Sequence, residues 1–285
     1  MVSTILIIKI VLFLIGLVIL VSLLQFFISI HPPKYTSKTN PSNFNLQYET
    51  VSFQTSDKIK IKAWLIPSKS ANSTVIIGHG YPFDKSNILP VVKFLYPDHN
   101  LLLYDHRYFG ESEGKITTVG LHEVKDVDAA IEFVRKKFGK NHPIALYGFS
   151  LSASAMLMSK SSVNAVIADS PYADLERMIN QVYSFFGPLK YPFVKITSLL
   201  GKLFLKSNPK EVSPLIFVKN SKVPILVIHG EKDSQISVDN SYSLKEANPN
   251  IELWIVPNAD HGESYALARE EYENKVKNFL NSNIR

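Results

Sequence analysis

The sequence predicts an α/β domain preceded by one membrane-spanning helix. Residues 10–30 contain no charged side chain. From Glu49 onward, short apolar runs alternate with longer amphipathic ones, which is typical of a parallel sheet covered by helices. One short run ends in a serine, Ser150, and a helix of small and apolar residues follows it. A serine in that setting indicates nucleophilic catalysis.

The uncharged stretch is long enough to cross a membrane, because its 21 residues would form a helix about 30 Å long, the thickness of a hydrocarbon core. The alternatives are a buried core helix and a cleaved signal peptide, and the signal peptide is the stronger rival. Signal peptides usually have only about 7–15 apolar residues and end in small residues, whereas Phe27 and Ile30 lead here into His31. We therefore expect an uncleaved anchor at residues 1–30. The flanking lysines leave the side of the membrane open.

Residues 31–46 follow the anchor and are rich in Pro, Ser and Asn. This composition predicts a linker that holds the domain off the membrane. We expect residues 47–285 to form the α/β domain. The expected strands are Thr50–Gln54, Ile59–Ile66, Thr74–Gly78, Asn100–Asp105, Pro143–Gly148, Ala165–Ala168, Val223–His229 and Ile251–Val256. Apolar residues at helical spacing predict a helix from Leu121 to Phe138, and a last helix is expected from about Glu263 to Leu280.

The candidate nucleophile, Ser150, lies in the segment Gly148 to Ser152, between a buried strand and a helix. A sharp turn of this kind strains the serine backbone, so the residues two before and two after it must be small. Gly148 and Ser152 meet that need, although the usual pattern ends in Gly. A serine that only caps the next helix is the alternative.

A serine needs a general base, because an unassisted alcohol is hardly ionised near neutral pH. His261 follows the last strand in a polar loop and is the best candidate. Asp233 follows the preceding strand by a short turn, and we expect it to orient the imidazole. Glu231 and Asp260 are the rivals for that role. The order Ser, Asp, His along the chain is the one that this fold class uses.

Two backbone N–H groups should stabilise the oxyanion of the tetrahedral intermediate. We expect one from Leu151, at the start of the helix, and the other from Tyr81, in the loop after the third strand. Gly80 allows the close backbone approach that this requires. His79 in the same loop is expected to support the loop and not to bind a metal.

These residues resemble the α/β-hydrolase superfamily, and within it the membrane-anchored serine hydrolases related to the Bem46 and ABHD13 type. The resemblance covers about residues 47–285. It rests on the His79–Gly80 loop, the segment Asp105–Gly114, the serine turn, and the loops that carry Asp233 and His261. It implies a mostly parallel eight-stranded sheet and hydrolysis of esters or thioesters without a cofactor. Tyr108 stands where the family commonly has Gly, so the local turn there is in doubt.

About fifty residues separate the sixth and seventh strands, more than a simple crossover needs. We expect residues 175–222 to form a helical cap. Its apolar residues can either pack on the body or line a pocket for an acyl chain. The pocket candidates are Tyr183, Phe186, Tyr191 and Phe193.

Composition narrows the remaining possibilities. The chain contains no cysteine, which excludes disulfides, a thiolate nucleophile and zinc-thiolate sites. The net charge of +6 is scattered and does not favour nucleic acid as a partner. No histidine spacing suggests a metal site. The sequence therefore predicts a membrane-anchored serine hydrolase acting on a small-molecule or lipid-like acyl ester, with no cofactor; a peptidase or amidase and a non-catalytic membrane scaffold are the alternatives.

Overall fold

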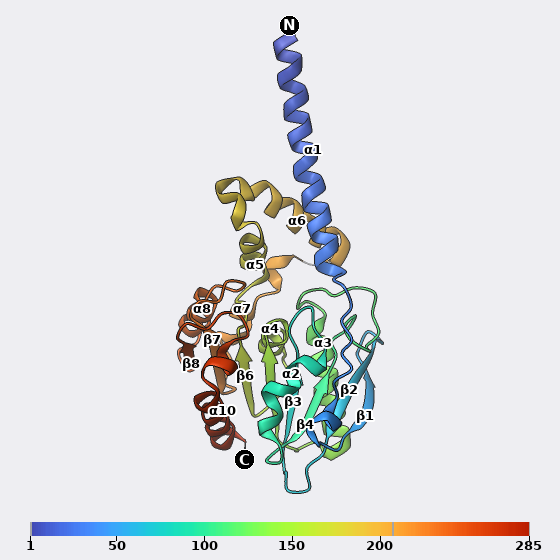
Figure 1. Cartoon of the computed structure of the whole chain (residues 1–285), viewed down its shortest axis with the longest axis vertical. Helices are drawn as coiled ribbons and strands as arrows, with labels where there is room; N and C mark the ends of the chain where they lie inside the picture. The colour runs from blue at the N-terminus through green and yellow to red at the C-terminus, as the bar shows by residue number, and fades with distance from the viewer. Residues whose placement is uncertain (1, 207, 285) are drawn as a thin grey trace.

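The computed structural model of the chain describes residues 2–206 and 208–284. Its body is one eight-stranded sheet covered by helices on both faces (Figure 1). The strand order is β1-β2-β4-β3-β5-β6-β7-β8. The pairs β1·β2 and β2·β4 are antiparallel, and all the other pairs are parallel. This confirms the predicted mostly parallel, eight-stranded α/β-hydrolase sheet.

The strands lie close to their predicted positions. They are β1 (Glu49–Gln54), β2 (Lys60–Ile66), β3 (Thr74–Gly78), β4 (Asn100–Tyr104), β5 (Ile144–Phe149), β6 (Ala165–Asp169), β7 (Ile225–Gly230) and β8 (Glu252–Val256). The helices around them are α2 (Lys85–Val92), α3 (Glu123–Phe138), α4 (Leu151–Met158), α7 (Pro214–Val218), α8 (Asp239–Ala247), α9 (Ser264–Leu267) and α10 (Arg269–Asn283). Short 3-10 turns occur at Pro41–Phe44 and Lys93–Leu95.

The two faces of the sheet bury separate apolar cores, because neighbouring residues of a strand point to opposite faces. On one face Ile76 of β3 packs with α3, α4, α7 and α8. On the other face Val75 and Ile77 of the same strand pack with α2 and α10. The central strands β3, β4 and β5 are buried almost throughout, as expected for strands covered on both sides.

The end of the chain differs from its prediction. One closing helix was expected from about Glu263 to Leu280, but α9 and α10 are separate helices. Ala268 lies between them with φ −127° and ψ 41°, outside the helical region. The backbone ladder of one continuous helix is therefore interrupted there.

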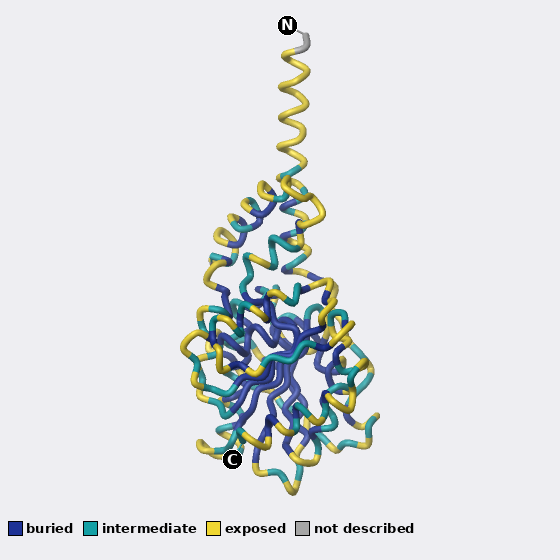
Figure 2. The backbone as a smooth tube through the Cα atoms, turned by 90° about the vertical axis from the view of Figure 1, so that its left-hand side faces the viewer, coloured by how far each residue is buried: buried dark blue, intermediate teal, exposed yellow. Residues whose placement is uncertain are grey.

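The first helix, α1 (Val2–Ile30), projects from the body, and a cap stands beside its second half (Figure 1). The cap consists of α5 (Leu175–Val182), a 3-10 turn (Ser184–Leu189) and α6 (Lys190–Leu205), followed by a short turn at Pro209–Glu211. Residues 4–17 are exposed on every side, whereas partial burial begins at Val18 (Figure 2). The next helix, α7, packs on α4 and α8 and belongs to the body.

The start of the segment 31–46 is bound to the body. The Tyr108 hydroxyl donates a hydrogen bond to the carbonyl of Pro32 at 2.6 Å. The N–H of Thr117 donates to the carbonyl of Ile30, the last residue of α1, at 3.0 Å. The lower end of α1 is therefore held in a defined position over the body.

Candidate active site

The turn between β5 and α4 presents Ser150 at the carboxyl edge of the sheet. Its backbone has φ 53° and ψ −110°, a strained conformation for a residue with a side chain. The turn is tight enough to require glycine at position 148, because a Cβ there would lie 2.5 Å from the backbone nitrogen of Ala153. The N–H of Ser150 donates to the carbonyl of Asp169 at 2.8 Å, which fixes the turn against β6.

The structure brings Ser150, His261 and Asp233 into one hydrogen-bonded row. The Ser150 Oγ lies 3.1 Å from Nε2 of His261. The Nδ1 of His261 lies 2.7 Å from Oδ2 of Asp233. Since a carboxylate only accepts, Nδ1 carries the proton, and Nε2 is left to accept the proton of the serine hydroxyl.

Asp233 is buried and makes four contacts. Besides His261, its carboxylate accepts hydrogen bonds from the N–H groups of Gln235 and Ile236, at 3.0 and 2.7 Å. The Nε2 of His229 lies 3.2 Å from Oδ2. Burial alone would raise the pKa of Asp233, but the bonds from His229 and His261, the charge of His261 and the N–H of Ile236 hold that pKa well below its ordinary value. The carboxylate therefore stays ionised beside the imidazole.

The two rival acids contact other groups. Asp260 accepts hydrogen bonds from the backbone and hydroxyl of Ser234, and from the backbone N–H of His261 at 2.7 Å. Glu231 accepts from the N–H of Asn258 at 3.0 Å. Among the residues that the structure describes, Asp233 is the only carboxylate bonded to the His261 ring.

The two N–H groups predicted to stabilise an oxyanion lie on the same cavity as the serine. Tyr81 and Leu151 line it together with Ser150 and His261. Within the described part of the chain, neither N–H donates a hydrogen bond to another protein group. Gly80 is needed for the close approach of this loop, because a Cβ there would lie 2.7 Å from the ring of Phe149.

Ser152, where glycine is usual, links two loops behind the site. Its hydroxyl donates to the carbonyl of His79 at 2.6 Å and lies 2.5 Å from Nε2 of His106. The N–H of His106 donates in turn to Nε2 of His79 at 3.1 Å, and Nδ1 of His79 bonds to the carbonyl of Gly80 at 2.8 Å. Burial and the nearby His106 lower the pKa of His79 to about 3, so this ring is neutral at physiological pH.

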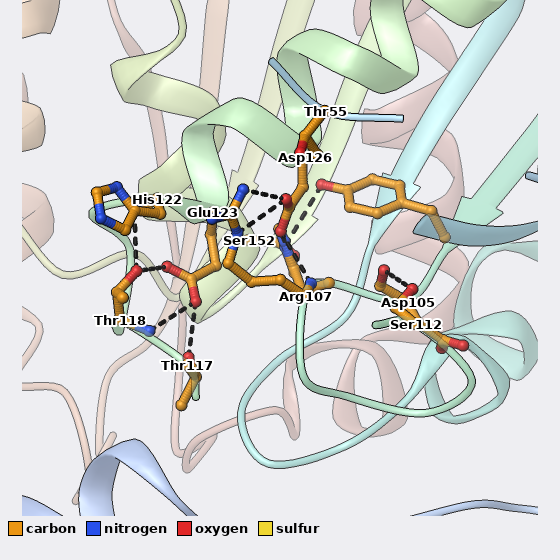
Figure 3. Close-up of polar contacts among 12 residues, drawn as sticks. Thr55, Asp105, Arg107, Ser112, Thr117, Thr118, His122, Glu123, Asp126 and Ser152 are labelled. Carbon is orange, nitrogen blue, oxygen red and sulfur yellow. Dashed lines mark hydrogen bonds and ion pairs between the residues drawn. The ribbon is translucent and has the colours of Figure 1, made fainter. Parts of the chain in front are cut away.

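Figure 3 shows polar contacts of the segment Asp105–Gly114, with Asp105, Arg107 and Ser112 drawn as sticks. The guanidinium of Arg107 donates two bonds to Oδ1 of buried Asp126, at 3.0 and 2.8 Å. It also bonds to Asp57 at 2.8 Å. Tyr108 has φ 72°, a left-handed conformation that favours glycine. The local turn is therefore one that suits glycine, although tyrosine occupies it. The Tyr108 ring contacts His31 and Lys34 in the segment after α1.

Of the row Ser150, His261 and Asp233, His261 lines two cavities and Ser150 lines the first of them. The first has a volume of about 270 Å³ and is mostly apolar; it lies between the body, the cap and α1. Its cap wall is made of Leu175, Met178, Ile179 and Val182 of α5 and of Thr197, Gly201 and Leu205 of α6. The second, of about 500 Å³, shares Tyr81, Gln235 and His261 with the first and includes Asp169 and Tyr147.

Sequence reasoning missed the contribution of α1 to the first, apolar cavity. Gln25, Phe26, Ser29 and Ile30 line it. The signal was present, because Gln25 and Ser29 interrupt an otherwise apolar run at a spacing of four, which places them on one helix face. Their side chains bond to each other at 3.2 Å.

The four pocket candidates of the cap do not line the first cavity. Tyr183 and Phe193 are buried in a small core between the cap and α1. Phe186 and Tyr191 are 38% and 58% exposed. The rings of Tyr183 and Phe193 are used in the contact between the cap and α1. The cap wall of the first cavity is formed instead by aliphatic side chains of α5, such as Ile179 and Val182.

Within residues 2–206 and 208–284, no three His, Cys, Asp or Glu side chains lie close enough to hold a metal ion. The Ser150 hydroxyl, the His261 ring and the Asp233 carboxylate are bonded to one another. The arrangement can therefore be described from these protein groups, which comprise a hydroxyl, an imidazole, a carboxylate and two N–H groups.

Comparison with known proteins agrees with the fold and the anchor. The profile of the BD-FAE family matches residues 91–247, more than half of the chain. YqkD of Bacillus subtilis is 29% identical over 231 residues, covering 78% of this chain and 75% of YqkD. Bem46 of Schizosaccharomyces pombe is 23% identical, covering 68% of this chain and 63% of Bem46.

Two further proteins bear on activity and location. The solved structure of an esterase from Pyrococcus furiosus has a TM-score of 0.76 and 28% identity, and it covers 90% of this chain and 99% of the esterase. A protein of Saccharomyces cerevisiae described as a membrane protein is 24% identical, over 84% of this chain and 82% of its own length. The helix α1 is itself long and apolar enough to cross a membrane. The predicted resemblance to the Bem46 group is thus confirmed, and membrane anchoring is supported.

Proposed function

Because the chain belongs to the BD-FAE family of α/β-hydrolases, we propose that it is a serine hydrolase that cleaves carboxylic ester or thioester bonds. The observation that carries the proposal is the row of Ser150, His261 and Asp233, joined at 3.1 and 2.7 Å. These distances are those of a nucleophile and base within hydrogen-bond reach, with a third group that orients the base.

In the proposed mechanism, Ser150 Oγ attacks the acyl carbon while His261 Nε2 takes its proton. Asp233 stabilises the imidazolium that forms. The carbonyl oxygen becomes an oxyanion and accepts hydrogen bonds from the N–H groups of Tyr81 and Leu151. His261 then gives its proton to the leaving alcohol or thiol, and an acyl-Ser150 remains. Water, deprotonated by His261, attacks the acyl carbon. His261 then returns this proton to Ser150 Oγ as the acyl–oxygen bond breaks, which releases the acid and the free serine.

The two cavities favour an ester whose acyl chain is apolar and whose leaving group is more polar. The apolar cavity between the body, the cap and α1 suits the acyl chain, because apolar lining removes its methylene groups from water. The second cavity also borders His261 and includes polar groups such as Asp169. It suits the leaving group, which receives its proton from the His261 ring.

Covalent labelling by a fluorophosphonate probe tests this function. We expect labelling of the full-length protein at Ser150 and its loss in Ser150→Ala. Ser154→Ala is the matched control, because this buried serine lies one helical turn later on α4 and bonds to the backbone of Tyr172. Absence of labelling in folded wild-type protein would rule out an activated serine and favour the scaffold.

A panel of octanoyl ester, thioester and amide substrates then tests the bond that is cleaved. We expect turnover of the ester and the thioester. Faster cleavage of the amide would replace this proposal by a peptidase or amidase.

A further inference from the structure

The exposed part of α1 is too short to cross a membrane by itself. Residues 4–17 are exposed on all sides and span about 21 Å of helix, against the roughly 30 Å of a hydrocarbon core. If the core begins after Lys9, the exposed part from Ile10 to Leu17 spans only about 12 Å. The missing length must come from the part of α1 beyond Val18, which lies beside the cap.

The cap cannot stay behind while this part of α1 enters the membrane, because the two are packed together. Phe26 and Ile30 form a buried cluster with Leu200 of α6. Val18 and Val21 pack on Tyr183 and Phe193 of the cap. The depth of α1 in the bilayer therefore sets the depth of the cap.

The outer surface of the cap suits a lipid environment. Large apolar side chains are exposed on it, with Phe185 93%, Leu189 74% and Leu203 64% exposed. Residues 175–211 of the cap contain five lysines and one arginine against two glutamates. Arg177 and Lys210 pair with Asp174 and Glu176, which leaves Lys190, Lys195, Lys202 and Lys206 as an excess of positive charge. Exposed apolar groups with cations around them match the acyl region and the phosphates of a leaflet.

We propose that the cap is seated in the leaflet through which α1 passes, so that the apolar cavity receives an acyl chain directly from a membrane lipid. The cavity wall supports this route, because Gln25 and Phe26 of α1 and Val182 of α5 line it together with Ser150. The seating of the cap rests on α1 crossing the membrane. The lipid ester as substrate rests on the proposed function.

Fluorescence quenching tests the seating without any measurement of activity. The chain has no cysteine, so single-cysteine variants of the full-length protein can be labelled with NBD and placed in phosphatidylcholine vesicles. Phe185→Cys and Leu189→Cys report on the cap, Phe13→Cys on exposed α1, and Tyr242→Cys on the body, where that side chain is 49% exposed.

We expect doxyl-lipid to quench the labels at 13, 185 and 189 several-fold more than the label at 242, and aqueous iodide to quench the label at 242 most. Cap labels that behave like the label at 242 would overturn the seating. A label at 13 that lipid does not quench would overturn its premise, the crossing of α1.

Hydrolysis by the double variant Phe185→Asp/Leu189→Asp tests the substrate class. We expect cleavage of a long-chain lipid ester in vesicles to fall about tenfold, or about 1.4 kcal/mol, while cleavage of a soluble acetyl ester stays at the wild-type rate. Equal rates of the variant and wild type on the vesicle ester would overturn the lipid route. If wild-type protein cleaves neither ester, the proposed function fails, and the quenching result still decides the seating.

Discussion

Ser150, Asp233 and His261 come from three different loops, yet their side chains form one hydrogen-bonded row. The position of His261 is determined by Asp233, since its Nδ1 lies 2.7 Å from that carboxylate. Asp233 is itself fixed by the N–H groups of Gln235 and Ile236. The tautomer that lets His261 accept the serine proton is therefore set by the turn after β7.

Replacement of this carboxylate tests the role that we propose for it. In Asp233→Asn, the amide can donate to Nδ1, so the ring turns to the tautomer with its proton on Nε2. We expect kcat for ester hydrolysis to fall by about 10⁴-fold, as for other triads that lose this acid. Asp260→Asn should cost less than about tenfold, because among the described residues the Asp260 carboxylate bonds only to backbone N–H groups and to the Ser234 hydroxyl. Equal losses in the two variants would contradict the assignment.

His79 gives a pH dependence of stability with a definite sign. Its pKa is lowered from 6.5 to about 3 in the folded protein, so between these values the unfolded chain binds a proton that the folded chain does not. Above pH 6.5 His79 is neutral in both states and does not lower the free energy of unfolding. As the pH falls below 6.5, protonation of His79 in the unfolded chain lowers this free energy. We expect the free energy of unfolding to decline by up to about 1.4 kcal/mol per pH unit more in wild type than in His79→Gln.

Urea unfolding of both proteins in the same detergent, at pH 7, 6, 5 and 4, measures this difference. The variant keeps the other titrating groups, so their contributions cancel in the comparison. A constant gap between the two curves across this range would show that His79 titrates normally.

The strands and the serine turn could be predicted because their signals are local. Glycine at position 148 is dictated by the turn itself, and the strand that precedes the turn is apolar throughout. The walls of the cavity depend instead on which elements meet after folding. Phe26 of α1 lies more than a hundred residues before Ser150 in the sequence, and no local pattern says that the two share a cavity.

In the cap too, local sequence patterns do not predict which residues line the cavity, although these residues lie closer to Ser150 in the sequence. Periodicity predicts which residues of α5 share a face, such as Met178 and Val182, but it does not say whether that face meets the cavity or the core. The large rings drew attention as pocket residues, and two of them, Tyr183 and Phe193, instead fill the contact between the cap and α1. Packing of the bulkiest groups decided the outcome.

The hydrogen bond between Ser152 of α4 and His79 of the loop after β3 can be tested by substitution. Ser152→Gly removes the bond to the carbonyl of His79 and the contact with His106, so the loop that carries Tyr81 loses one support. We expect kcat to fall about 5- to 10-fold, from a hydrogen bond of about 1 kcal/mol, with little change in KM. Ser154→Gly has a similar cost in helix propensity, and it removes bonds to the backbone of Tyr172 instead of this link. A similar loss of kcat in both variants would assign the effect to the helix.

The anchor, the cap and the body form one connected unit. The end of α1 is bonded to the body through Ile30 and Thr117, and its second half packs on α6. Ser22, buried completely, bonds to the carbonyl of Val18 on this packed side. The polar residues that interrupt the apolar stretch are thus explained by protein contacts. We therefore expect α1 to contribute to the proposed substrate site as well as to anchor the protein.

Phe26 is the residue of α1 whose removal tests this view most directly. It is 4% exposed and lines the apolar cavity, so Phe26→Ala removes a wall against which an acyl chain can be buried. We expect the ratio of kcat/KM for octanoyl over acetyl esters, which should exceed one in wild type, to fall about 5- to 30-fold for a loss of about 1–2 kcal/mol.

Phe13→Ala is the matched control, because Phe13 lies on the same helix but is 69% exposed. It should leave the octanoyl-to-acetyl ratio unchanged, since Phe13 is not among the residues that line the apolar cavity. A ratio that falls equally in both variants would assign the effect to anchoring in the membrane. A ratio that stays constant in Phe26→Ala would remove α1 from the substrate site and leave chain-length preference to α5 and α6.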